Sequence, residues 1–192
     1  MKKIIYLQKL GDVEPGILIQ LKKDLKWVLK GFIDSVKNLP NPIPLTDFEY
    51  DPSRRQYNAS LLLRKLIEYT NKKQYFRTLG IIDKDIFSKF LNFVFGVAII
   101  PKTHFLKGPG ASLISITRLR ENFYRRPENK ALFELRILKE AVHELGHTFG
   151  LEHCNNNCVM KFSNSLADTE EKPAKYCQSC SYKLKKLFLS MK

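Results

Sequence analysis

A short segment of the chain combines residue types that bind metal and move protons. His143 and His147 are four positions apart, and Glu144 directly follows the first histidine. Residues with this spacing lie one above the other on a helix face, so both imidazoles can bind one ion with the carboxylate beside it. Gly150 allows the helix to end, and the following turn would return His153 as a third ligand. Three histidines leave one coordination position open, which is typical of catalytic zinc.

This set of residues predicts hydrolysis of a peptide bond. Zinc polarises a carbonyl and lowers the pKa of a water molecule from 15.7 to about 7. Glu144 would take the proton of that water and then pass it to the leaving amine. Each histidine should donate its other ring N–H to an acceptor that the sequence does not name. A chance motif is the alternative, but three of the four histidines fit HExxHxxGxxH. The fourth, His104, is expected to be a surface residue.

All four cysteines lie in one C-terminal segment. Cys154 follows the third histidine, Cys158 comes four positions later, and Cys177 and Cys180 form a second close pair. Two thiolate pairs separated by a loop have the spacing of a tetrahedral structural zinc. Reactive or disulfide-bonded cysteines are the alternative, but two close pairs without a spare thiol favour a metal. We therefore expect two zinc ions, one catalytic and one structural, in a protein from a reducing compartment.

These residues together resemble the archaemetzincins, a branch of the metzincin zinc peptidases. The motif of that family is HExxHxxGxxHC, followed by Cys-x-Met and then by CxxC. Met160 matches the Met-turn methionine of the family, which implies a hydrophobic floor beneath the histidine ligands. The resemblance covers most of the chain from about Tyr50 onward. Other segments that resemble the family are Arg54–Tyr57, Asp83–Phe87 and Leu91–Gly96.

The chain departs from the family pattern near its cysteines. Three residues, rather than the usual four, separate Cys154 from Cys158, and the loop from Met160 to Cys177 is one residue short. Astacin-like metzincins have a tyrosine two positions after the methionine, where this chain has Phe162, so no phenolic ligand is expected there. The resemblance implies a metallopeptidase that acts on peptides or small protein segments, and aminopeptidase-like activity in some relatives.

Hydrophobic spacing predicts the elements that must position these residues. The motif lies in an expected helix over Glu128–Phe149 with an apolar stripe. Another helix is expected to begin at Pro15 and to continue to about Val36, and two more are expected at Ala59–Asn71 and Ser181–Leu189. The expected strands and extended segments are Lys3–Gln8, Leu45–Tyr50, Arg77–Ile82, Asn92–Ile100 and Ser112–Arg118.

Strands that alternate with helices predict an α/β or α+β fold. The resemblance implies a metzincin-like, twisted and mixed sheet, largely parallel, with backing and active-site helices. We expect one catalytic domain over residues 1–192. Its N-terminal subdomain, residues 1–150, would end with the active-site helix. A small C-terminal subdomain, residues 151–192, would contain the Met-turn and be pinned by the cysteine-bound zinc.

The segment Ser112–Arg118 precedes the active-site helix and is a candidate edge strand above the cleft. In metzincins such a strand pairs with an extended peptide substrate, a form of β-augmentation. An internal strand without substrate contact is the alternative. Arg118 and Arg120 would either bind a carboxylate or be solvated. The residues expected to contact substrate are Leu113, Ile114, Ser115 and Ile116.

The net charge of +14 raises a second hypothesis, a zinc-stabilised, non-catalytic binding protein for nucleic acid or acidic partners. The lysines are dispersed, however, and only the tail from Lys183 is locally dense, so solvated surface is favoured and nucleic acid is not expected. Glu144 also favours the enzyme, because a binding module needs no acid–base group.

No apolar run approaches the roughly 20 residues of a membrane span, so no membrane partner is expected. The apolar stretch near the N-terminus ends at Gln8, which is too short for a signal peptide. We therefore expect an intracellular, cytoplasmic protein whose partner is a peptide or protein-segment substrate. The oligomeric state is not predicted.

Overall fold

The computed structural model describes residues 2–89, 91–100 and 108–190. Its largest sheet has five strands in the order β2-β1-β5-β8-β7. All neighbours in it pair in parallel except β7, which is antiparallel to β8. The strands are β1 (Ile4–Leu10), β2 (Ser35–Asn38), β5 (Arg77–Ile82), β7 (Gly96–Ala98) and β8 (Gly110–Ser115).

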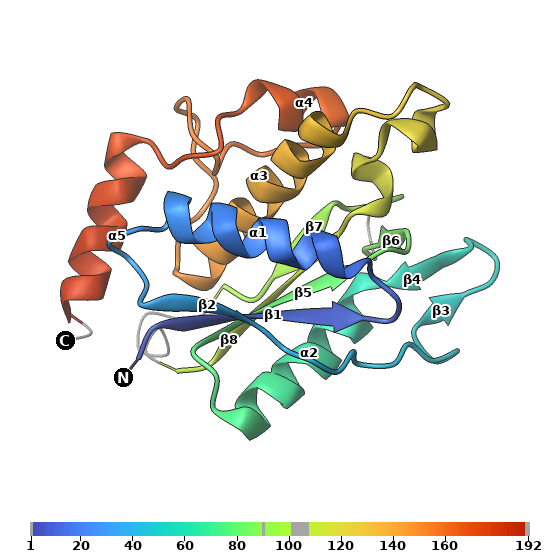
Figure 1. Cartoon of the computed structure of the whole chain (residues 1–192), viewed down its shortest axis with the longest axis horizontal. Coiled ribbons are helices and arrows are strands. Elements are labelled where there is room, and N and C mark those ends of the chain that lie inside the picture. Colours follow the sequence, from blue (N-terminus) through green and yellow to red (C-terminus); the bar gives the residue numbers. More distant parts are fainter. Residues whose placement is uncertain (1, 90, 101–107, 191–192) are drawn as a thin grey trace.

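Helices cover both faces of this sheet (Figure 1). One face packs against α1 and α3 and the other against α2, and each face has its own cluster of buried apolar side chains. Because β5 and β8 are covered on both sides, every residue in them is buried. The helices are α1 (Pro15–Val28), α2 (Ala59–Lys73), α3 (Lys130–Thr148), α4 (Leu166–Glu171) and α5 (Gln178–Ser190).

Shorter elements join these layers. A second sheet of three strands has the order β3-β4-β6, and two 3-10 turns lie between β8 and α3. The strands of the small sheet are β3 (Tyr50–Asp51), β4 (Gln56–Asn58) and β6 (Ile86–Phe87), and the 3-10 turns are η2 (Thr117–Leu119) and η3 (Glu121–Tyr124). Among the described residues, no helix is both long and apolar enough to cross a membrane.

The predicted mixed α/β fold is confirmed, but one expected helix was too long. The helix that begins at Pro15 ends at Val28, and Ser35–Asn38 is a strand that pairs with β1. Val36 is buried there opposite Ile5. Its apolar spacing fitted a helix, yet the free edge of β1 offers this segment a ladder of backbone hydrogen bonds.

The prediction of an edge strand at Ser112–Arg118 is wrong. The strand β8 ends at Ser115 and lies between β5 and β7, so both of its edges are paired. Leu113, Ile114 and Ser115 are therefore internal, and Ile116 lies beyond the strand. The edge strand is β7, a short part of the expected strand Asn92–Ile100.

Two buried arginines fix the position of α3, the helix that carries the motif. The Arg77 guanidinium donates from Nε to the Thr148 carbonyl at the C-terminal end of α3, 3.0 Å away. Arg136 donates to the Leu119 carbonyl and contacts the carboxylates of Glu121 and Glu170. A positive charge at a helix C-terminus is favourable, and the Arg136 guanidinium is tolerated in the core because the carboxylates of Glu121 and Glu170 balance its charge.

Replacement of Arg77 by methionine tests this anchoring. Arg77→Met leaves the Thr148 carbonyl without its donor in the core and should lower the free energy of unfolding by roughly 3 kcal/mol. Urea unfolding followed by circular dichroism measures the change. Arg64→Met, at an exposed position on α2, is the control and should stay within about 0.5 kcal/mol of wild type. Equal stability of the two variants would contradict the anchoring role.

Candidate metal centres

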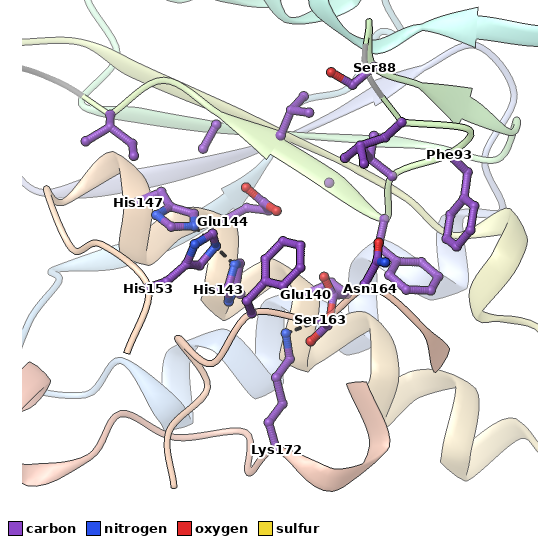
Figure 2. Close-up of a pocket in the computed structure, with 18 of the residues that line it drawn as sticks. Ser88, Phe93, Glu140, His143, Glu144, His147, His153, Ser163, Asn164 and Lys172 are labelled. Atoms are coloured by element: carbon purple, nitrogen blue, oxygen red, sulfur yellow. Dashed lines mark hydrogen bonds and ion pairs between the residues drawn. The ribbon is translucent and has the colours of Figure 1, made fainter. Parts of the chain in front are cut away.

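The three histidines of the motif converge as predicted (Figure 2). His143 and His147 project from α3, and His153 returns from the turn after the helix. One ring nitrogen from each lies within 4.8 Å of the others, a separation that suits a shared ion. Gly150, with φ of 84°, has the left-handed conformation that ends the helix and directs the chain back.

Backbone carbonyls set the orientation of the two helix imidazoles. His143 Nδ1 lies 2.8 Å from the Val159 oxygen, and His147 Nδ1 lies 2.7 Å from the Leu151 oxygen. A carbonyl only accepts, so each Nδ1 must carry the proton and each Nε2 must carry a lone pair. The two Nε2 atoms lie only 3.1 Å apart. Facing lone pairs repel at that distance unless a cation lies beside both, so the donor set fits a metal ion.

The surroundings keep these imidazoles neutral. Burial, with help from the nearby Lys172 charge, lowers the pKa of His143 to about 2. Burial also lowers the pKa of His147 and of His153. Neutral imidazole is the form that binds metal, so protons do not compete with an ion here.

Glu144 lies beside the histidines, between α3 and the edge strand β7 (Figure 2). Burial, together with the neighbouring Glu140 carboxylate, raises its pKa well above the usual value. The close approach depends on Gly96 of β7, because a Cβ atom there would lie 2.6 Å from the Glu144 carboxylate. This glycine is a site residue that the motif did not reveal, although glycine inside a strand often marks such an approach.

Met160 packs against the active-site helix. It is fully buried, and a Cβ atom on Gly146 would lie 2.4 Å from its sulfur. Because Gly146 lies inside the HExxH motif, the methionine is next to the segment that carries the histidines. This packing supports the hydrophobic floor expected of a Met-turn residue.

The four cysteines form a second cluster. Their sulfur atoms lie within 4.8 Å of one another, and no disulfide joins them. The Cys158 sulfur accepts hydrogen bonds from the backbone N–H groups of Met160 and Cys177, at 3.5 and 3.2 Å. These donors favour the thiolate, the form of cysteine that binds metal, and so oppose burial, which raises the pKa of Cys158. The shortened spacing after Cys154 therefore still brings the sulfurs together for one tetrahedral ion.

The histidines open into a cleft of about 440 Å³. Apolar side chains form part of its lining. The Phe162 ring meets the His153 ring edge-on, with 5.0 Å between the two ring centroids. At one end of the cleft Lys172 reaches toward Glu140, and its Nζ lies 2.9 Å from the carboxylate (Figure 2). The apolar side chains of the lining are Leu91, Phe93, Val94, Phe95, Val97, Ala98, Ile100 and Phe162.

The arginines after β8 do not face this cleft. Arg118 forms two hydrogen bonds of 2.7 Å with the Asp85 carboxylate, and Arg120 forms one of 2.7 Å with Asp83. Both arginines therefore form ion pairs, which join η2 and the residue after it to the loop that follows β5. His104 lies outside the described residues.

Comparison with known proteins identifies the family. A model of peptidase family M54 matches residues 23–186 of the chain. The chain belongs to this family. Archaemetzincin from Methanocaldococcus jannaschii is 41% identical over 181 residues, which cover 94% of this chain and 92% of the relative. The predicted resemblance is thereby confirmed, and the present chain is a zinc metallopeptidase rather than a non-catalytic binding module.

Solved archaemetzincin structures share the fold. The protein from Archaeoglobus fulgidus has a TM-score of 0.77 at 37% identity, over 94% of this chain and 99% of its own. The protein from Methanopyrus kandleri has a TM-score of 0.78 at 30% identity, over 98% of this chain and 96% of its own. The metzincin-like sheet with its backing and active-site helices is therefore the shared architecture.

The contact between Gly96 and Glu144 yields a direct test. Gly96→Ala should displace the Glu144 carboxylate while it leaves all ligands in place, and a shift of about 1 Å should lower kcat/KM roughly 100-fold. Zinc content, measured by mass spectrometry, should not change. Gly16→Ala is the control, because the nearest atom to its added Cβ is a flexible carboxylate oxygen of Glu14 at 3.2 Å. Full activity of Gly96→Ala would show that the close approach is unimportant.

Proposed function

We propose that this peptidase cleaves extended peptides or unstructured protein segments, with Glu144 as the general acid–base group. The observation that carries the proposal is the pair of facing Nε2 atoms of His143 and His147, 3.1 Å apart, beside the buried Glu144 carboxylate in a cleft of about 440 Å³. Such a donor set suits an ion with a free coordination position, and the adjacent carboxylate suits proton transfer.

We further propose two zinc ions for this chain. His143, His147 and His153 would hold the first, and the four cysteines would hold the second. The first supplies Lewis acidity, since zinc polarises a carbonyl oxygen and makes water a stronger acid. The second supplies folding free energy, because the segment around Cys154 and Cys158 has no helix or strand of its own.

The chain itself provides the proton transfers. The Glu144 carboxylate takes a proton from the attacking water and then donates it to the nitrogen of the leaving amine. Its burial raises its pKa, which makes the carboxylate a stronger proton acceptor. The Nδ1–carbonyl hydrogen bonds of His143 and His147 hold both rings in one orientation throughout. The apolar wall of the cleft favours substrates with apolar side chains near the scissile bond.

The edge strand β7 supplies the groups that would align a substrate. Hydrogen bonds to β8 involve the Phe95 carbonyl and the Ile99 N–H. In an antiparallel ladder these positions alternate, so the N–H and C=O groups of Gly96 and Ala98 point away from β8, toward the free edge. Both residues line the cleft. A peptide that adds to this edge would pass beside Glu144 with its backbone held by hydrogen bonds.

Aminopeptidase-like cleavage needs a carboxylate for the substrate ammonium, and Glu152 is the exposed carboxylate that lines the cleft, since Glu140 is paired with Lys172. Without that recognition the enzyme would cleave within oligopeptides.

A cytoplasmic location is proposed because four unpaired cysteines persist in a reducing compartment.

The acid–base role is tested by Glu144→Gln. This variant keeps every metal ligand, so it should retain two zinc ions per chain and lose at least about 100-fold in kcat. A peptide-library digest read by mass spectrometry provides the substrates. Glu134→Gln, on the same helix but away from the cleft, should cleave like wild type. Substantial residual activity in Glu144→Gln would contradict the assignment.

Substrate binding along β7 is tested with N-methylated peptides. Methylation of one backbone nitrogen at a time should raise KM at alternate residues, because only every second residue of an added strand bonds to Gly96 and Ala98. A uniform profile along the peptide would contradict the strand-addition mode. Acetylation of the peptide N-terminus, tested in the same series, should abolish cleavage by an aminopeptidase and spare internal cleavage.

A further inference from the structure

The two candidate metal centres share the same stretch of chain. Cys154 of the thiolate cluster directly follows His153 of the histidine cluster. Four residues later the chain presents Cys158, and the next residue, Val159, supplies the carbonyl that holds His143. A displacement of this short loop would therefore move parts of both centres.

A backbone hydrogen bond to the segment that precedes Cys177 holds Val159 in place. Its N–H donates to the Lys175 carbonyl at 2.9 Å, and Lys175 lies two residues before Cys177. The N–H of Cys177 donates in turn to the Cys158 sulfur at 3.2 Å. These two hydrogen bonds join the segment of Cys158 and Val159 to the segment of Lys175 and Cys177. The position of the carbonyl that orients His143 is thus set by the arrangement of the cysteines.

Tyr176 makes a second connection, directly to the active-site helix. It lies between Lys175 and Cys177, and its hydroxyl donates to the Val142 carbonyl at 2.9 Å. Its ring lies 3.2 Å from the Cβ that Gly146 lacks, so it packs on the turn of α3 that spans the HExxH motif. The side chain is 8% exposed, which leaves it little freedom to move independently of its neighbours.

We propose that Tyr176 is a positioning residue that couples the two centres, so that an ion in the thiolate cluster raises the affinity of the histidine cluster for its own ion. The proposal rests on the two metal sites of the proposed function. Four thiolates around an ion hold Cys158 and Cys177 together, and through Val159 and Tyr176 they fix the acceptor of His143 and the helix turn that carries it. Outer hydrogen bonds of this kind change metal affinity about 10- to 100-fold. Coupling between sites is reciprocal, so the histidine-bound ion should tighten the thiolate site by the same factor.

Titration with cobalt(II), followed by absorption spectroscopy, measures the two sites separately. Thiolate ligands give an intense charge-transfer band, whereas the histidine site gives weak visible bands only. In wild type the thiolate band should saturate first, and the histidine site should then fill tightly. Cys177→Ser should lower the cobalt affinity of the histidine site about 10- to 100-fold, although it removes no ligand from that site.

Tyr176→Phe removes a single hydroxyl and should lower the histidine-site affinity about fivefold, the effect of one hydrogen bond. In the double variant with Cys177→Ser, the combined loss should be smaller than the product of the two single losses, because both act through one connection. Tyr182→Phe, at an exposed position on α5, is the matched control and should leave both bands and both affinities unchanged. A merely structural tyrosine would lower the melting temperature and leave the histidine-site affinity as in wild type.

The coupling is overturned if the histidine site binds cobalt equally well in wild type and in Cys177→Ser. Should Cys177→Ser not fold, Tyr176→Phe decides, because it retains all seven ligands, and an unchanged histidine-site affinity in that variant overturns the proposal. Independent filling of two sites leaves the proposed peptidase function intact. Absence of the histidine-site bands in wild type overturns the metal assignment itself, and cleavage assays are not needed to separate these outcomes.

Discussion

The hydrogen bonds from two imidazoles to backbone carbonyls determine what this site can do. They place the proton of His143 and of His147 on Nδ1 and so turn both Nε2 lone pairs toward a single point. The acceptors, Val159 and Leu151, lie in the irregular segment after the active-site helix. The geometry of the helix alone is therefore insufficient, and the return of the chain after Gly150 is what makes the histidines a metal site.

Buried charges hold that geometry in place. Arg77 donates to the C-terminal end of α3. Arg136, on α3 itself, pairs with carboxylates outside the helix, and the Glu140–Lys172 ion pair joins the helix to the chain after α4. Each of these charges would be costly to bury alone. Arg136 and Lys172 are tolerated because carboxylates balance their charge, and Arg77 because it donates to backbone carbonyls. The core thus combines an apolar sheet–helix interface with polar anchors that act on one helix.

The sequence identified the histidines and cysteines that cluster in the structure because their arrangement is local. The spacing of His143 and His147 follows from the helical repeat, and the two cysteine pairs are close in sequence. Strand order is not local, and so β8 was mistaken for an edge strand although β7 pairs outside it. Backbone acceptors such as the Val159 carbonyl occur in every residue type, so the residue types alone do not reveal them. Lys172 and Tyr176 likewise act across distances in the chain that a spacing argument does not reach.

The irregular segment between α3 and α4 has a consequence for the order of folding. The segment contains His153 and Met160 and has no helix or strand of its own, and Met160 is buried in the same apolar cluster as the sheet and α3. Because His143 and His147 lie on α3 and His153 lies in this segment, the three histidines come together only when the segment packs against the helix. Synthesis reaches His153 after α3, so the set of three histidines forms only once this segment has been made and has packed on the helix.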